Sequence, residues 1–423
     1  VFRIFGIVTV SYAFAALFVS SLLPLKNTHS NTAEKLSDFL QSPRLSYHDN
    51  KSYNNTAETV IFPTDVDDSN HRNDEGRNII KYDSNYLSEN NKNPGAALLE
   101  NGMNMSFGAC LLIMDDNHWL IEWLAYHYFV LPLTHLIVAV DPRSKTSPKH
   151  ILDRWKGRIP FIQMWDDSHI NFTVPHDPSE PYYLLYLHNH RQINFYQKCL
   201  KAYQADSDGP SWVMTVDTDE MVRPNSGEME HGAVWRELQT LQQRRESDLL
   251  LPHKDVMECI NMARFQFGGL EKLRNNVFPF LNIPKRMFMT FRNQQRQKDL
   301  LLLENMDGGK NLINVRNVQV FPDMAPLSVH QVLPQCPNRS DFHYAPVVHH
   351  YAGSKYQFNY RDDPRREEHT KMKGIRKSFL QRQSTGKVTD RIITSWLEKF
   401  TQFVGGASEA YRLLQDVGKL EDQ

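Results

Sequence analysis

The sequence of 423 residues has no excess of charge of either sign, because 48 lysines and arginines stand against 49 aspartates and glutamates. Non-specific binding of nucleic acid needs a positive field, so this balance disfavours a nucleic-acid partner. Cysteine is scarce, and the four cysteines lack the C-x-x-C spacing of zinc sites: Cys110, Cys199, Cys259 and Cys336. One or two disulfides, with three full pairings available, and buried free thiols are both compatible with this scatter.

Charge is also absent from Ile4 to Leu25, an apolar run that lies between Arg3 and Lys26. Its length approaches what a bilayer requires, and we predict a signal-anchor transmembrane helix over residues 1–25. The alternative is a cleaved signal peptide, whose apolar core would be unusually long here. A buried core helix would show an amphipathic face, and this run is apolar all round.

Residues 26–104 contain few aromatic residues and no periodic apolar pattern. Such a segment cannot bury enough apolar surface to offset the entropy of ordering, so we predict a disordered stem. Sequons for N-glycosylation fit a chain with a lumenal body. They begin at five asparagines: Asn50, Asn54, Asn104, Asn171 and Asn338.

From Phe107 onward, strand-like and helix-like segments alternate. Apolar runs predict strands over 107–114, 135–141, 158–165 and 212–216, and helical periodicity predicts helices over 118–131, 147–155 and 183–204. This alternation predicts an α/β domain over residues 105–366, with a mostly parallel sheet flanked by helices and ligands at the carboxyl ends of its strands. Residues 367–423 predict a helical tail, interrupted at Gly405-Gly406, that packs on the domain or mediates self-association.

Acidic residues follow all four predicted strands. They are Asp115 and Asp116, then Asp141, then Asp166 and Asp167, and finally Asp217 and Asp219. A single aspartate at such a position is more often part of a turn than a ligand. Four strands in succession that end in this way favour a ligand-binding edge.

The fourth acidic pair carries the strongest signal. Asp217 and Asp219 are two residues apart in extended chain, so both side chains point the same way. Two close carboxylates repel each other unless a cation screens them, and Mn²⁺ or Mg²⁺ prefers such oxygen ligands together with substrate phosphates. We therefore predict a divalent cation at this pair. The alternative is a solvated acidic turn, but a buried strand leads directly into the pair.

Two segments in this region resemble the helix and the D-x-D-E strand of glycosyltransferase family 92, QINFYQKCL (192–200) and WVMTVDTDE (212–220). Further segments are similar to others of that family in the same order: the helix at 122–127 and strand at 135–141, FQFGG (265–269) and HHY (349–351). The resemblance covers roughly residues 107–360. It depends on the order of these segments, because no single one of them is specific.

The resemblance implies a GT-A fold, with a Rossmann-like sheet that binds a nucleoside-diphosphate sugar in its first half and the acceptor in its second half. It implies a metal-dependent hexosyltransferase that uses Mn²⁺ or Mg²⁺, a UDP-linked sugar such as UDP-galactose and a glycan acceptor, with inversion. The implied metal ligands are Asp217, Asp219 and either His349 or His350, and His330 is a rival third ligand. With the anchor and the sequons, it implies a single-pass type II protein of the Golgi membrane with a lumenal catalytic domain.

Further candidates concern the nucleotide sugar and the acceptor. By the same resemblance Asp141 holds the nucleoside, and Asp115 and Asp116 replace the family's usual polar pair after the first strand. Lys355 and Arg361 lie in a basic run that could close over the diphosphate, although a solvated basic face is commoner. Glu271 is our candidate base for deprotonating the acceptor, because the two glycines before it allow close approach of a sugar.

Two other classes of protein share some of these features. A glycoside hydrolase also uses paired carboxylates, but they act from opposite sides of the scissile bond, whereas Asp217 and Asp219 share one side. A non-catalytic lumenal module that binds carbohydrate or mediates adhesion would explain the anchor, the stem and the sequons. In that protein the acidic pair would be a structural cation site.

Overall fold

The computed structural model describes residues 106–173, 177–247, 258–268, 276–296, 309–318, 345–351 and 388–419, together with His330, Cys336 and Tyr360. The predicted anchor (1–25) and stem (26–104) lie outside the described residues, and so do Glu271, Lys355 and Arg361. Within the described ranges, no helix combines the length and the apolar character that a membrane span requires.

A six-stranded sheet forms the centre of the described part, and its strand order is β3-β2-β1-β4-β11-β6. The first four strands run parallel, namely β3 (Phe161–Trp165), β2 (Leu133–Val140), β1 (Phe107–Ile113) and β4 (Trp212–Thr215). The last two are antiparallel to their neighbours, β11 (Lys310–Asn314) and β6 (Cys259–Met262). The prediction of a mostly parallel sheet therefore holds for the first four strands only, because β11 returns in the opposite direction.

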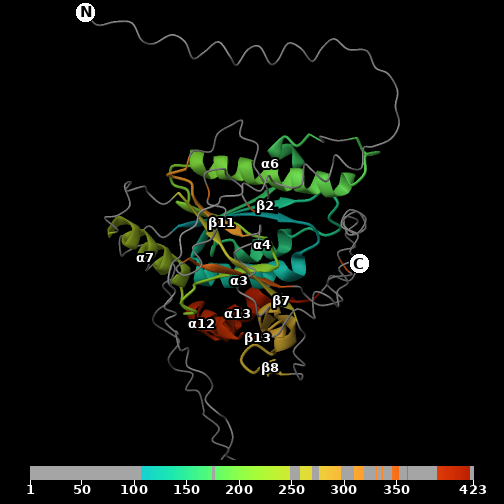
Figure 1. Ribbon diagram of the computed structural model, residues 1–423. Coiled ribbons are helices and arrows are strands. Elements are labelled where there is room, and N and C mark those ends of the chain that lie inside the picture. The colour runs from blue at the N-terminus through green and yellow to red at the C-terminus, as the bar shows by residue number, and fades with distance from the viewer. Residues whose placement is uncertain are drawn as a thin grey trace, which may run out of the picture. The chain divides into compact units, whose positions relative to one another are not determined.

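Helices cover both faces of this sheet, which confirms the predicted α/β class. Helix α6 (Tyr183–Ala205) lies on one face, and α3 (Asn117–Val130) and α4 (Lys149–Trp155) lie on the other (Figure 1). Helix α6 is amphipathic, and Phe195, Cys199 and Tyr203 recur at helical spacing and are buried against the sheet.

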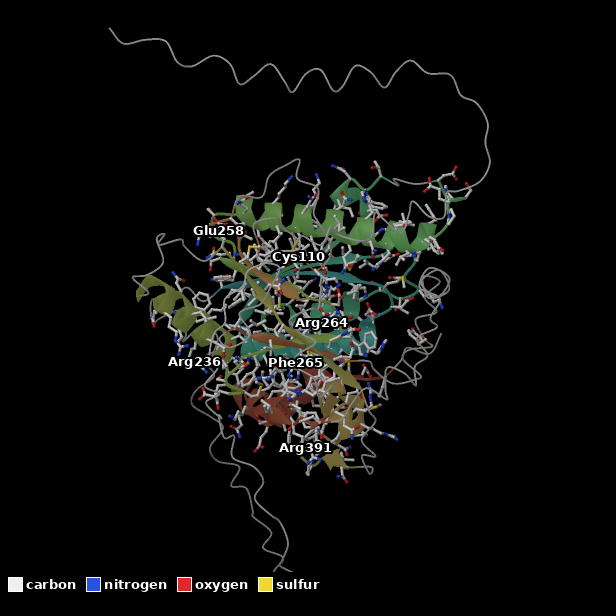
Figure 2. All side chains as sticks on the ribbon, in the orientation of Figure 1. Cys110, Arg236, Glu258, Arg264, Phe265 and Arg391 are labelled. Carbon is white, nitrogen blue, oxygen red and sulfur yellow. A yellow bond between two sulfur atoms is a disulfide. The ribbon has the colours of Figure 1, made fainter. Side chains whose placement is uncertain are left out.

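Disulfides attach two segments to the central sheet. Cys110 of β1 is bonded to Cys199 of α6, and Cys110 is labelled in Figure 2 beneath that helix. Cys259 of β6 is bonded to Cys336. Of the three full pairings open to the sequence, the structure contains this one, and it leaves no free cysteine. The first bond fixes the helix that carries Arg191, Gln192 and Tyr196 over the strand that precedes Asp115.

A second, five-stranded sheet has the order β13-β10-β7-β12-β5. Its strands are β13 (Val388–Thr389), β10 (Gln295–Arg296), β7 (Arg264–Gly268), β12 (Val347–Tyr351) and β5 (Glu220–Arg223). Only β7 and β12 pair in parallel. Because β5 begins directly after Asp219, the turn of residues 216–219 leads from the first sheet into the second.

Shorter elements complete the described part. They are α5 (Asp167–Ile170), α7 (Ala233–Ser247), the hairpin of β8 (Val277–Phe278) and β9 (Ile283–Pro284), η3 (Lys285–Met287), α8 (Met289–Arg292) and η5 (Ile392–Ser395).

Two helices near the end of the chain pack against α3, α12 (Trp396–Phe403) and α13 (Ala407–Leu414). Gly405 and Gly406 separate them with φ angles of 102° and 110°, a region that favours glycine, so the helix is interrupted where the sequence predicts. Trp396 is fully buried and donates its indole N–H to Thr290 Oγ1 at 3.1 Å. Of the two roles left open for the tail, packing on the domain is the one these helices show.

His127 joins helix α3 to strand β5. The backbone N–H of Val222 donates to His127 Nε2 at 3.1 Å, so Nδ1 carries the proton and donates to the carbonyl of Trp123 at 2.9 Å. The ring is fully buried, and burial lowers its pKa to about 3. His127 is therefore neutral at physiological pH.

This lowered pKa predicts that acid destabilises the protein. The His127 imidazole binds a proton more tightly in the unfolded chain, where the pKa of histidine is near 6.5, than in the folded protein. The contribution of neutral His127 to the free energy of unfolding is therefore complete above pH 6.5 and is lost as the pH falls towards 3. At pH 4.5 the free energy of unfolding should be lower by roughly 2.5 kcal/mol from this group alone. Denaturant titrations of wild type and His127→Gln at pH 7.5 and 4.5 measure the difference. The exposed His150→Gln is the control; equal pH dependence in all three proteins contradicts the assignment.

Candidate functional site

The order of the strands reverses between β1 and β4. Strands β2 and β3 follow β1 on one side of it, and β4, the next strand in the sequence, lies on the other side of β1. Ligands of open α/β sheets bind at such a reversal, beyond the carboxyl ends of the strands. Asp115 and Asp116 follow β1, and Asp217 and Asp219 follow β4. The structure thus brings the first and the fourth acidic pairs to neighbouring strand ends. The sequence predicts acidic residues at this edge of the sheet but not the order of the strands.

Asp217 is held by side chains from two other elements. Lys310 Nζ donates to Oδ2 at 2.8 Å, and Gln192 Nε2 of α6 donates to Oδ1 at 2.9 Å. The hydroxyl of Tyr196 donates to Oδ1 at 3.5 Å. Burial would raise the pKa of Asp217, but the Lys310 ammonium outweighs burial and holds that pKa well below its usual range. The carboxylate is therefore ionised, fixed in orientation and still 39% exposed.

Lys310 is the functional candidate that sequence reasoning missed. Its side chain is 0% exposed, and Nζ lies 2.8 Å from Asp217 Oδ2 and 3.2 Å from Glu220 Oε2. Burial by itself would lower the pKa of Lys310, but the two carboxylates raise it well above its ordinary value. The sequence signal is weak, a lysine directly before the short segment Asn311-Leu-Ile-Asn-Val315. Lysine is rarely buried in proteins, and Lys310 is the one buried lysine among the residues that the structure describes.

Glu220 lies inside the protein between two cations. Its Oε1 accepts a hydrogen bond from Arg264 Nη1 at 3.2 Å, and its Oε2 accepts one from the backbone N–H of Asp217 at 2.9 Å. Arg264 belongs to β7 of the second sheet and is labelled in Figure 2. Glu220 is fully buried, so its role is to hold the turn of residues 216–219, the D-x-D turn, in place and not to contact a ligand.

Asp219 faces His350. Its Oδ2 lies 3.3 Å from His350 Nε2, and each side chain is 18% exposed. The backbone also joins these segments, because the N–H of Tyr351 donates to the carbonyl of Asp219 at 2.8 Å. His350 Nδ1 is buried and finds no hydrogen-bond partner in the described part of the chain. A carboxylate and an imidazole thus meet at the surface of the site.

His349 points away from this pair, as adjacent residues of a strand must. Arg223 Nε donates to its Nε2 at 2.6 Å, and its ring stacks on Phe267 with centroids 4.2 Å apart. Burial lowers the pKa of His349 well below its ordinary value. Its nitrogen lone pair is engaged by Arg223, so of the two histidines named as ligands the structure brings only His350 to Asp219.

His330 lies near the same turn. Its Nδ1 is 3.3 Å from the carbonyl oxygen of Gly309, the residue before Lys310. Burial lowers the pKa of His330 to about 4, with the charge of Lys310 as the next cause. A neutral imidazole therefore stands close to Asp217.

The aspartates after β1 bind the protein itself. Asp115 Oδ1 accepts hydrogen bonds from the backbone N–H groups of Lys145 and Thr146 at 2.7 and 3.1 Å. Asp116 is the N-cap residue of α3, and its Oδ2 accepts from the N–H of Met114 at 3.1 Å. Both are buried and shape the loop beside β1. Their predicted contact with a nucleotide sugar gains no support from these bonds.

Asp141 after β2 and Asp167 after β3 are bound by Arg191 of α6. The guanidinium donates to Asp167 through Nε and Nη2 at 2.9 and 3.0 Å, and to Asp141 Oδ2 at 3.3 Å. Arg143 also donates to both oxygens of Asp141. Burial would raise the pKa of Asp141, but the bonds from Arg143 lower it far below the usual range. Asp141 is thus neutralised by arginines, where the resemblance implies a nucleoside contact.

No group of three or more histidine, cysteine, aspartate or glutamate residues that could hold a metal occurs in the described ranges. Asp219 and His350 supply two donors. Mg²⁺ and similar ions are held by one or two protein carboxylates together with substrate phosphates and water. The pair therefore fits an ion that arrives with a phosphorylated ligand and does not fit a cage made by the protein alone.

Comparisons with known proteins find neither a matching family model nor a matching curated protein. Among the solved structures similar to this chain are crystal structures of S. aureus TarS 1-349 and of the same protein in complex with UDP-GlcNAc. Their identities are 12% and 13% and their TM-scores 0.27 and 0.28, and each alignment covers 75% of this chain and 90% of the other. Likeness at this level defines no family, so the resemblance to glycosyltransferase family 92 stays a prediction.

Proposed function

We propose that this protein is a glycosyltransferase of GT-A fold that takes a sugar from a nucleoside diphosphate with the help of Mn²⁺ or Mg²⁺. The observation that carries the proposal is the position of Asp217 and Asp219. They lie at the strand-order reversal of a parallel sheet, on a turn that leads into a second sheet carrying His350. This is the edge at which such sheets bind nucleotides.

The side chains of the turn suit this chemistry. Departure of a nucleoside diphosphate develops negative charge, which a divalent cation held by Asp219 and His350 would neutralise. Asp217, ionised and oriented by Lys310 and Gln192, is arranged to accept hydrogen bonds from hydroxyl groups of the donor. Glu271 as the acceptor's base, and Lys355 and Arg361 as a basic cover over the diphosphate, remain part of the proposal on sequence grounds.

A donor screen tests the proposal. The protein is incubated with UDP- and GDP-sugars in the presence of Mn²⁺, and released nucleotide is measured with and without a chelator. We expect release from a UDP-sugar that stops when the metal is removed. If the protein neither binds nor consumes any nucleotide, the non-catalytic carbohydrate-binding or adhesion module is the better reading.

We also propose that the body of the protein faces the lumen of the Golgi. Two disulfides suit an oxidising compartment. Of the five sequons, Asn171-Phe-Thr is the one within the described residues, and Asn171 is exposed at the end of α5 with the left-handed φ of 50° that asparagine tolerates.

Asn171 is therefore expected to carry an N-glycan when the protein is made in a secretory pathway. Asn171→Gln and Thr173→Ala should each remove one glycan, seen as a smaller mobility shift on glycosidase treatment than that of the wild type, whereas Thr173→Ser should keep the glycan. Identical mobility of Asn171→Gln and the wild type before treatment contradicts the expectation.

A further inference from the structure

Four charged groups around the D-x-D turn balance one another. Asp217 and Glu220 are the anions, and Lys310 and Arg264 are the cations that pair with them at 2.8 to 3.2 Å. A divalent cation is attracted to carboxylates whose charge is not already compensated. Asp217 is therefore a poor metal ligand in this arrangement, although the spacing of the motif assigns it the same role as Asp219.

The ammonium lies behind the carboxylate, on the protein side. Lys310 is 0% exposed, whereas Asp217 is 39% exposed. An approaching ligand thus meets the carboxylate and not the lysine. Lys310 Nζ also pairs with Glu220, which is fully buried, so the ammonium is fixed in the interior of the protein. Because the same ammonium pairs with Asp217, it fixes the position of the Asp217 carboxylate as well.

The backbone holds Lys310 in place. It is the first residue of β11, whose register against β4 and β6 pairs Lys310 with Met262 and Asn311 with Thr215. Gly309, directly before it, packs so closely on Asn261 that a Cβ atom there would lie 1.7 Å from Asn261 Oδ1. The close packing of the strands leaves the lysine little freedom to move away.

Resting on the function proposed above, we infer that Lys310 is a positioning residue: its buried ammonium orients the Asp217 carboxylate and takes the place of a second cation, so that a divalent ion binds at Asp219 and His350. The D-x-D pair is thereby divided. Asp219 meets the cation, and Asp217 meets the nucleotide as a fixed hydrogen-bond acceptor.

Binding of Mn²⁺, followed by the loss of its free-ion electron paramagnetic resonance signal with and without UDP, tests this division on the full chain. We expect Asp219→Asn to weaken Mn²⁺ binding about tenfold or more. Asp217→Asn should change the affinity for Mn²⁺ by no more than about threefold, but it should weaken the binding of UDP. Lys310→Met, which keeps the length of the side chain, should tighten Mn²⁺ binding about threefold or add a second ion, because two carboxylates lose their cation.

Each outcome decides the inference. If Asp217→Asn loses Mn²⁺ as completely as Asp219→Asn, or if folded Lys310→Met loses Mn²⁺ binding, Lys310 does not divide the pair, even though the proposed function stands. Should Lys310→Met fail to fold, the double variant Lys310→Met/Glu220→Gln, which removes one charge of each sign, and Asp217→Asn carry the decision. A wild type that binds neither Mn²⁺ nor UDP overturns both the inference and the proposed function.

Discussion

Asp219→Asn is expected to lower kcat/KM for Mn²⁺-dependent turnover of a UDP-sugar by about three orders of magnitude, the scale of losing one electrostatic group from a transition state. Asparagine keeps the shape of the side chain but loses the charge that holds the cation. The backbone carbonyl of residue 219 still accepts the N–H of Tyr351, so β5 and β12 remain joined. The melting temperature should stay within about 3 °C of wild type.

The matched control for this change is Asp153→Asn. Asp153 is an exposed carboxylate of α4 paired with Lys149 and Lys156, and its loss should leave turnover unchanged. Steady-state rates of nucleotide release over a range of Mn²⁺ and donor concentrations measure both variants. An Asp219→Asn protein that keeps more than about a tenth of wild-type kcat/KM contradicts a role for this carboxylate in stabilising the transition state.

The largest expected effect on stability is that of Glu122→Ala. Glu122 lies in the middle of α3, is 1% exposed, and its two oxygens accept three hydrogen bonds from the first turn of α8. The donors are the backbone N–H of Met289 at 2.6 Å and the N–H and hydroxyl of Thr290 at 3.1 and 2.6 Å. Alanine leaves these buried donors without an acceptor and should lower the free energy of unfolding by about 3–5 kcal/mol.

Glu122→Gln is the control for this prediction. Its amide oxygen still accepts from α8, so we expect a loss of only about 1–2 kcal/mol. Burial raises the pKa of Glu122 despite these bonds, so a neutral side chain of equal shape is tolerated better than its removal. Urea titrations at pH 7 distinguish the variants, and a Glu122→Ala protein within about 1 kcal/mol of wild type would show that the bonds to α8 are not made.

The fold of the first half of the domain followed from the sequence because it depends on local periodicity. Apolar runs that alternate with helices define β1 to β4. Because these strands are parallel, Asp115 and Asp217 lie at one edge of the sheet, however the loops are shaped. The Gly405-Gly406 break was readable for the same reason, since glycine acts locally.

The partners of the acidic residues could not be read in this way. Lys310 and Asp217 are 93 residues apart, and they meet only because β11 enters the sheet antiparallel to β4 in a particular register. Which of His349 and His350 faces Asp219 depends on the same kind of register, since a shift of one residue exchanges the two faces of a strand. The disulfide pairing of Cys110 with Cys199 likewise needs the position of α6 over β1.

The central claim is that Asp219 and His350 hold a divalent cation which binds a nucleoside diphosphate beside Asp217. A crystal structure of the full chain with Mn²⁺ and UDP, using the anomalous scattering of manganese, tests it most directly. The account predicts one manganese peak about 2.1 Å from Asp219 Oδ2 and a histidine nitrogen of residue 350, with UDP phosphates completing its ligands. A peak bound to Asp217 with Lys310 displaced, or UDP bound away from the carboxyl end of β4, would contradict it.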